Sequence, residues 1–275
     1  MTLRIALAQI SAGPDGADNL RRALTMMDRA ADAGAALVAF PELALLPFFP
    51  QWEQYAGARA LAEPIPGPTS DRIAAKAAQH GLVTVFNLYE EANGRYFDSS
   101  PVFDADGTLL GVTRMVHITN YPCFHEQAYY APGDRGAAVY QTRVGRVGVA
   151  ICYDRHYPEY MRALGLGGAD LVVIPQAGAL DEWPEGMYEA EVRAAAFQNG
   201  YFAALCNRVG IEDRLTFGGE SFAVSPTGEI LARGKRMEED LVLADLDLVA
   251  CAKSPARTLF LKDRRPEVYR EWARG

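Results

Sequence analysis

The stretch Arg146-Val147-Gly148-Val149-Ala150-Ile151-Cys152-Tyr153-Asp154 carries the pattern that decides the fold class. Residues 147–151 are apolar or glycine without alternation, which is typical of a strand buried on both faces. Pro158 and Glu159 then begin a helix-like segment, because proline suits a first helical turn and glutamate suits the positive end of the helix dipole. A strand that turns into a helix in this way predicts an α/β protein.

Cys152 lies at the predicted strand-to-helix turn, at the carboxyl edge of the sheet, where α/β proteins place their chemistry. Two interpretations follow from this pattern. Cys152 is either an exposed nucleophile or a small apolar residue of the core, since free cysteines are often buried and inert. The strand-turn-helix pattern alone does not favour one of them.

The rest of the chain supplies further strands, helices and turns. Apolar segments predict strands over 3–10, 35–40, 82–89, 95–103, 108–116, 169–175, 201–206, 221–224, 229–232 and 241–246. Helices are expected over 18–33, 71–80 and 186–199, and Asn93-Gly94 and Asp106-Gly107 are hairpin turns. This mixture of βα alternation and hairpins predicts two sheets sandwiched between helix layers in one domain, residues 1–275. Residues 253–275 form a charged C-terminal tail with a short helix near 267–273.

Composition excludes several classes of function. The net charge of −8 argues against a nucleic-acid partner, and the 49% of hydrophobic residues suits a large core and subunit contacts. No apolar run has transmembrane length and the N-terminus lacks a signal-peptide pattern, so we expect a cytoplasmic protein without a membrane partner. The four cysteines are read as reduced thiols, and Cys123 with His125 lacks the second pair that a zinc site needs. No metal or cofactor is expected.

Other candidate residues lie in connections between the predicted elements. Glu42 directly follows a predicted strand, where it is either a solvated loop charge or a catalytic acid–base, and acidic residues are mostly exposed. The aromatic loop 44–57 is either a pocket wall or a subunit contact. The connection 117–135 is long enough to be functional, and Trp183 lies in the loop 176–185.

Taken together, these segments resemble the nitrilase, or carbon–nitrogen hydrolase, superfamily over nearly the whole chain. Phe40-Pro41-Glu42-Leu43 resembles the glutamate motif of that family, and Ile151-Cys152-Tyr153-Asp154 resembles its cysteine motif. Residues 113–118 occupy the place of the lysine motif, and the segments that also fit are 122–126, 132–134, 157–159, 207–210 and 225–229. Among the branches of the family, the carbamoyl-amine amidases and ureidopropionases are the most similar.

The resemblance implies a four-layer αββα sandwich that forms a homodimer or a higher homo-oligomer. It also implies hydrolysis of small amide or N-carbamoyl substrates through a thioester acyl-enzyme. Cys152 would be the nucleophile and Glu42 the general base and acid, provided that burial raises its pKa toward neutrality. Glu126 would position the substrate or Glu42, and the backbone N–H of Tyr153 would donate to the oxyanion.

Met115 is the departure from the family pattern, because it stands where the family has a lysine. A methionine offers neither a proton nor a charge, so Cys152 is expected to stay a thiol between two acids. His117 lies on the same side of the strand and is the geometric substitute, although it also reads as a structural histidine. Arg155 and His156, just after the nucleophile turn, are further candidates to compensate, although a solvated turn is the favoured interpretation. The alternative to an enzyme is therefore a binding or scaffold protein that has lost turnover.

Overall fold

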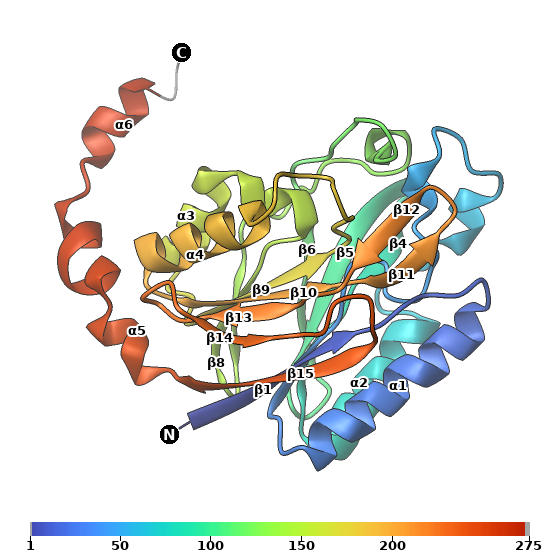
Figure 1. Ribbon diagram of the computed structural model, residues 1–275, viewed down its shortest axis with the longest axis horizontal. Helices are drawn as coiled ribbons and strands as arrows, with labels where there is room; N and C mark the ends of the chain where they lie inside the picture. The colour runs from blue at the N-terminus through green and yellow to red at the C-terminus, as the bar shows by residue number, and fades with distance from the viewer. Residues whose placement is uncertain (1, 273–275) are drawn as a thin grey trace.

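The computed structural model describes residues 2–272, so the end of the predicted tail helix, residue 273, lies outside the described residues. Two β-sheets pack face to face, and a pair of helices covers the outer face of each sheet (Figure 1). The predicted four-layer αββα sandwich is therefore confirmed. No helix within residues 2–272 is long and apolar enough to cross a membrane.

The first sheet has seven strands in the order β15-β1-β2-β3-β5-β4, with β6 also paired to β5. β1, β2 and β3 run parallel to one another, which places the ends of their apolar runs at the same edge. Its strands are β1 (Thr2–Gln9), β2 (Leu37–Ala39), β3 (Val83–Val85), β4 (Leu88–Ala92), β5 (Arg95–Phe103), β6 (Leu109–Arg114) and β15 (Asp240–Asp247).

The second sheet has six strands in the order β14-β13-β10-β9-β8-β7, and its central strands β8, β9 and β10 are parallel. Its strands are β7 (Val139–Thr142), β8 (Gly145–Val149), β9 (Leu171–Gln176), β10 (Phe202–Asn207), β13 (Phe222–Val224) and β14 (Ile230–Arg233). A separate hairpin is formed by β11 (Val209–Glu212) and β12 (Leu215–Gly218).

Helices α1 (Gly16–Asp32) and α2 (Pro68–His80) pack on the first sheet, whereas α3 (Pro158–Leu166) and α4 (Met187–Asn199) pack on the second. α1 begins where the side chain of Asp15 accepts a hydrogen bond from Ala17 N at 2.9 Å, an N-cap that satisfies an otherwise free N–H. The single-turn helices are η1 (Phe49–Gln51), η2 (Ala58–Leu61), η3 (Glu126–Ala128), η4 (Cys152–His156) and η6 (Leu261–Asp263), with a π-helical turn, η5, at Ala256–Phe260.

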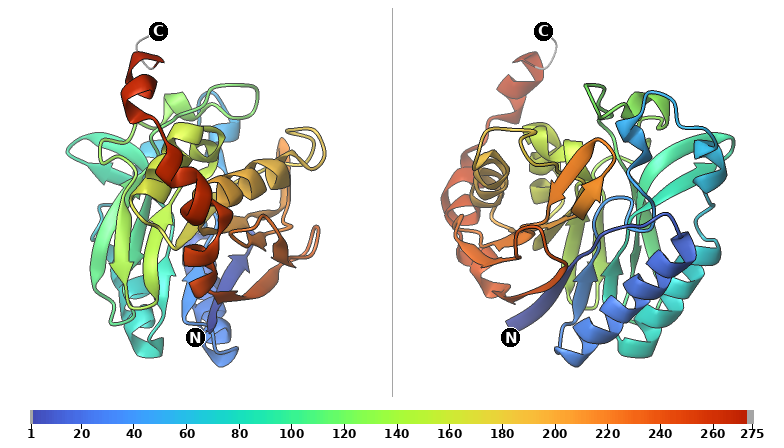
Figure 2. Two further views of the ribbon diagram at one scale, coloured as in Figure 1. Left: turned by 90° about the vertical axis from the view of Figure 1, so that its left-hand side faces the viewer. Right: turned by 45° about the vertical axis from the view of Figure 1, so that its right-hand side comes forward.

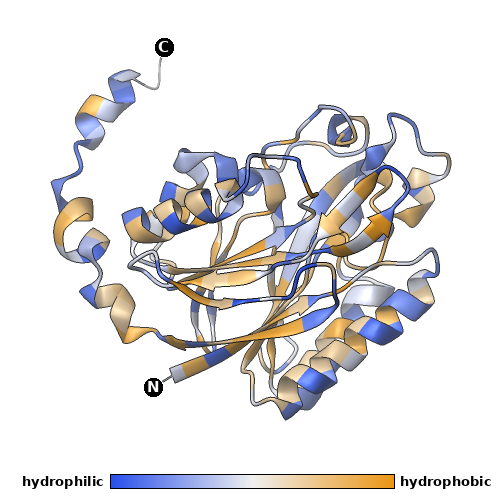
Figure 3. Cartoon of the chain, in the orientation of Figure 1, coloured by the Kyte–Doolittle hydropathy of each residue, from blue (hydrophilic) through white to orange (hydrophobic). Residues whose placement is uncertain are grey.

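Three apolar layers hold the four structural layers together. The layer between the sheets contains Leu7, Val149 and Val173, and the layers under the two helix pairs contain Met27 and Leu164 respectively. In Figure 3 the strands are mostly hydrophobic, whereas α1 and α2 mix hydrophobic and hydrophilic segments. This pattern explains why the strand predictions rested on unbroken apolar runs and the prediction of α1 on a periodic one.

Three parts of the predicted secondary structure are wrong. The expected single strand 82–89 is two strands, β3 and β4, because the chain breaks at Asn87, whose amide bonds the Leu43 N–H (2.7 Å) and Asp98 (2.5 Å). The expected loop from Asn207 contains the hairpin β11–β12, and strand β7 was not predicted.

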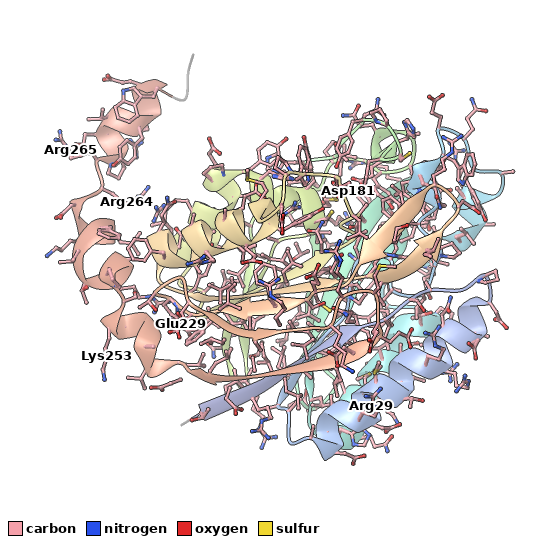
Figure 4. All side chains as sticks on the ribbon, in the orientation of Figure 1. Arg29, Asp181, Glu229, Lys253, Arg264 and Arg265 are labelled. Atoms are coloured by element: carbon pink, nitrogen blue, oxygen red, sulfur yellow. The ribbon has the colours of Figure 1, made fainter. Side chains whose placement is uncertain are left out.

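The C-terminal segment leaves the sandwich. It consists of α5 (Val249–Lys253), η5, η6 and α6 (Pro266–Trp272), so the predicted short helix is confirmed within the described residues. Figure 1 and both views of Figure 2 show this segment running along one side of the molecule, with α6 standing clear of the sandwich. Lys253, Arg264 and Arg265 lie along it in Figure 4.

Candidate active site

The site forms where parallel strands of both sheets end. Glu42 lies three residues beyond the end of β2, and Cys152 lies three residues beyond the end of β8. Glu126 comes from the first position of η3, within the long connection that follows β6. One carboxylate oxygen of Glu42, one of Glu126 and the sulfur of Cys152 all lie within 4.8 Å of one another, and all three residues are buried.

Cys152 occupies a strained turn. Its φ of 43° lies in the left-handed region, which costs a residue with a side chain about 1–3 kcal/mol and persists only where the surroundings impose it. Because Cys152 also starts η4, its side chain leaves the line of the strand and turns toward the carboxylates. The turn therefore aims the thiol at the groups with which it would exchange a proton.

The loop that carries Glu42 is held by a buried arginine. Arg208 donates from Nη1 to the backbone oxygens of Glu42 (3.0 Å) and Leu43 (2.7 Å), and from Nη2 to Leu46 O (2.9 Å). Leu43 itself has a φ of 46°, so a second left-handed residue lies directly beside a candidate catalytic group. Arg208 thus binds the backbone of this loop, and within the described residues both carboxylate oxygens of Glu42 lack a hydrogen-bond partner.

Burial dominates the electrostatics of the carboxylates. Burial raises the pKa of Glu42 to about 8, and the neighbouring Glu126 adds to the rise. The pKa of Glu126 is also raised well above its usual range, first by burial and then by Asp98. A carboxyl group that titrates near neutrality can both accept and return a proton, which is the condition for general acid–base chemistry.

Asp98 is a third buried acid of the site that the sequence analysis missed. It lies in β5, accepts a hydrogen bond from Asn87 Nδ2 at 2.5 Å, and faces Glu42. Burial and the Glu42 carboxylate raise the pKa of Asp98 well above its usual range. Asp98 lies inside a strand rather than after one, so position in the sequence gave no signal for it.

Cys152 also contacts the amide of Gln176 and the guanidinium of Arg155. Burial raises the pKa of its thiol, as do Glu42 and Glu126, whereas Arg155 lowers it. Gln176 donates from Nε2 to the Cys152 sulfur at 3.2 Å, and Arg155 donates to the Cys152 carbonyl at 2.9 Å. Arg155 is buried, which corrects the expectation of a solvated turn at this residue, while His156 is half-buried. Gln176 ends an apolar strand as Glu42 follows one, and the same sequence signal could have found it.

Met115 directly follows β6 and is buried in the layer between the sheets that also contains Cys152. The next two residues are attached to the nucleophile turn, because Asp154 accepts from Val116 N (3.2 Å) and His117 N (3.0 Å). The His117 ring also bonds Asp154 (2.7 Å) and stacks on Tyr157 with centroids 3.5 Å apart. The His117 side chain is therefore held by Asp154 and Tyr157, which lie in and directly after the turn that carries Cys152.

Aromatic side chains and one further carboxylate enclose the site. Glu182 accepts from Tyr121 Oη at 2.5 Å, from Ala179 N at 3.0 Å and from Tyr188 Oη. Trp183 packs edge-on against Tyr121, and it lines a cavity of about 550 Å³ beside the loop 178–186. Figure 4 labels Asp181 in this loop, at the edge of the sandwich.

The aromatic loop 44–57 was expected to form either a pocket wall or a subunit contact. Phe48 and Phe49 are buried inside the chain, where they pack with Phe124 and Tyr130. Tyr55 is exposed. The buried part of this loop thus supports the segment that carries Glu126.

Known proteins are similar to this chain in sequence and in fold. The family model described as carbon–nitrogen hydrolase matches residues 4–256. The chain is 32% identical to N-carbamoylputrescine amidase of Solanum lycopersicum over 97% of this chain and 93% of that protein, and 28% identical to citrullinase of Francisella tularensis over 99% and 98%.

Solved structures agree with this relationship. The carbon–nitrogen hydrolase of Helicobacter pylori G27 superposes with a TM-score of 0.93 at 28% identity, covering 99% of both chains. A mutant amidase from Nesterenkonia sp. AN1, with the acetamide moiety of fluoroacetamide added covalently at its active-site cysteine, superposes with a TM-score of 0.82 at 28% identity, covering 98% of this chain and 96% of that one. By its sequence and its fold, this chain belongs to the carbon–nitrogen hydrolase family and is a hydrolase.

Proposed function

We propose that this hydrolase cleaves amide or N-carbamoyl C–N bonds of small molecules through a thioester on Cys152. The observation that supports this most is the buried convergence of the Cys152 sulfur with Glu42 and Glu126 within 4.8 Å. A thiol, a titratable base within reach of it and a second carboxylate are the groups that nucleophilic acyl transfer needs. Relatives named N-carbamoylputrescine amidase and citrullinase support this class of substrate.

Acylation begins when Glu42 removes the proton of the Cys152 thiol and the sulfur attacks the carbonyl carbon. The tetrahedral intermediate collapses when the C–N bond breaks and Glu42 returns the proton to the leaving amine or ammonia. Water then attacks the thioester carbon, Glu42 takes a proton from that water, and the acid leaves as the thiol is restored. The pKa of Glu42, raised to about 8, suits both directions of this transfer.

Stabilisation of the oxyanion is the part of this mechanism for which the site offers fewest groups. Tyr153 lies in the first turn of η4, where backbone N–H groups have no partner within the helix, and we assign its N–H as one oxyanion donor. We infer that Met115 stands in the place of a lysine that would have been the second donor. Glu126 is assigned to position the substrate or Glu42. Trp183 is assigned as a substrate contact because it packs edge-on against Tyr121, one of the aromatic residues near the site.

A binding or scaffold protein is the second candidate function, and the buried Met115 is the observation that favours it. A panel of amides and carbamoyl amines separates the two functions. The hydrolase releases ammonia from at least one of them, and acid quenching of its turnover reaction traps a Cys152 acyl adduct that intact-mass measurement detects. Absence of both ammonia release and adduct on the whole panel would favour the scaffold.

We also propose that the protein is a cytoplasmic homodimer or higher oligomer, with one domain followed by residues 253–275 as a clasp. The four cysteines are free thiols, which supports a reducing compartment. The tail exposes Leu259, Phe260 and Trp272, and its last helix, α6, stands clear of the sandwich (Figure 2). Light scattering at micromolar concentration is expected to give at least twice the 30.0 kDa chain mass, and a stable monomer would contradict the clasp.

A further inference from the structure

We propose that Gln176 is a catalytic hydrogen-bond donor to the Cys152 sulfur and that Arg155 positions it. This assignment rests on the proposed function and deepens it, because it names a further residue that stabilises the nucleophile. Gln176 is the last residue of β9, the strand next to β8, and it is fully buried. Its Nε2 lies 3.2 Å from the Cys152 sulfur.

The orientation of the Gln176 amide follows from its neighbours. Arg155 Nη1 lies 3.0 Å from Gln176 Oε1, and a guanidinium has donors only. The amide oxygen must therefore face Arg155, which leaves the NH₂ group to face the sulfur. A sulfur that carries negative charge is the acceptor that such a donor favours.

Arg155 is fixed by several contacts, so that the amide has little freedom. The same Nη1 donates to the Cys152 carbonyl at 2.9 Å, and Nε lies 3.4 Å from a carboxylate oxygen of Glu191. The guanidinium carbon lies 4.6 Å from the centre of the Tyr188 ring. In a site of low dielectric, a cation at the oxygen end of an amide strengthens the donor at its nitrogen end.

Other charges around the thiol act in opposite directions. Glu42, Glu126 and Glu182 disfavour the thiolate, and Arg155 favours it. Gln176 transmits the influence of Arg155 to the sulfur without placing a second ion there. In the thioester the sulfur is uncharged, so the hydrogen bond from Gln176 stabilises it less. The effect of Gln176 is therefore greatest when the thiolate attacks and when it leaves the tetrahedral intermediate.

Two substitutions of similar shape test the donor. Gln176→Met keeps the volume and removes the N–H, whereas Gln176→Glu keeps an oxygen for Arg155 and replaces the donor with an acceptor. The measurement is the rate of iodoacetamide alkylation of Cys152 across neutral and alkaline pH, with the modified residue identified by peptide mass. We expect both variants to react roughly ten- to a hundredfold more slowly at neutral pH, because a hydrogen bond to a charged group is worth about that factor. The midpoint of the profile should rise, and most in Gln176→Glu.

Gln9→Met is the matched control. Gln9 also ends a buried strand, and its Nε2 donates to Lys235 O and Glu238 O rather than to a sulfur. The control should keep the alkylation profile of the parent even where its melting temperature falls. Thermal unfolding identifies the variants that fold. The alkylation profile of either folded Gln176 variant is sufficient to test the donor.

The role of Arg155 is tested by Arg155→Met alone and combined with Gln176→Met. If Arg155 acts through the amide, the double variant slows alkylation by less than the product of the two single effects. A parent-like profile in a folded Gln176 variant would overturn the donor assignment, and fully multiplicative effects would overturn the positioning role. Alkylation needs no substrate, so a slowed Gln176→Met in a protein that hydrolyses nothing would sink the proposed hydrolysis alone.

Discussion

Cys152 and Cys206 are both buried in the layer between the sheets, and burial raises the thiol pKa of each. Their surroundings differ. Cys206 continues the regular register of β10 opposite Pro175 of β9, and its sulfur contacts Ala39 O at 3.4 Å. Cys152 lies at a left-handed turn and meets Glu42, Glu126 and Gln176. Burial is therefore common to both thiols, and only the turn gives one of them a base and a donor.

The largest expected difference between the two cysteines is in turnover. Cys152→Ala removes the atom that forms the thioester, so we expect hydrolysis to fall by about a thousandfold or more. Cys206→Ala removes one sulfur from the core and should keep the rate of the parent. The measurement is ammonia release on the same panel of amides and carbamoyl amines. Equal rates in the parent and Cys152→Ala would refute the comparison.

The second expected difference is in the reactivity of the two thiols when a cation is added beside Cys152 and not beside Cys206. Met115→Lys introduces a side chain of similar length, and we expect its ammonium to lie near Glu42 and Glu126, where pairing would offset the cost of its burial. It should lower the pKa of the Cys152 thiol, speed its alkylation at neutral pH, and raise acylation by roughly a hundredfold through an added oxyanion donor.

The alkylation of Cys206 is the internal control. Its rate in folded Met115→Lys should equal its rate in the folded parent. Slower alkylation of Cys152 than in the parent would show that other residues already perform the function of the lysine. Gln176 and His117 would then be the first residues to substitute in the Met115→Lys background.

The third expected effect is on the pH dependence of stability. The pKa of Glu42 is about 8 in the folded protein against an ordinary value of 4.5, so the folded state holds a proton that the unfolded state has lost. The stabilisation is complete below pH 4.5 and is lost as pH rises toward 8, at about 1.4 kcal/mol per pH unit for this group.

Urea denaturation at a series of pH values measures this slope. Glu42→Gln should flatten it by the share of one group, whereas Cys206→Ser should not change it, because a thiol that titrates above pH 9 stays protonated throughout this range. An unchanged slope in Glu42→Gln would mean that Glu42 is ionised in the folded protein, contrary to its burial.

Sequence patterns predicted the layers of the fold because each layer leaves a local signature. Unbroken apolar runs marked the parallel strands β1, β8, β9 and β10, and a periodic apolar pattern marked α1. The hairpin β11–β12 was missed because its two strands have only four residues each and mix buried with partly exposed positions. The break at Asn87 was missed because its cause is two contacts with distant residues.

Glu42 and Cys152 were candidates from sequence because each follows an apolar strand, and that position is a property of the chain itself. Whether they meet was decided by the packing of one sheet on the other, since 110 positions separate them. Asp98 and Arg155 belong to the site only through tertiary structure. A charge in a strand or a turn looks solvated in the sequence, and burial changes its meaning by removing the water that would otherwise surround it.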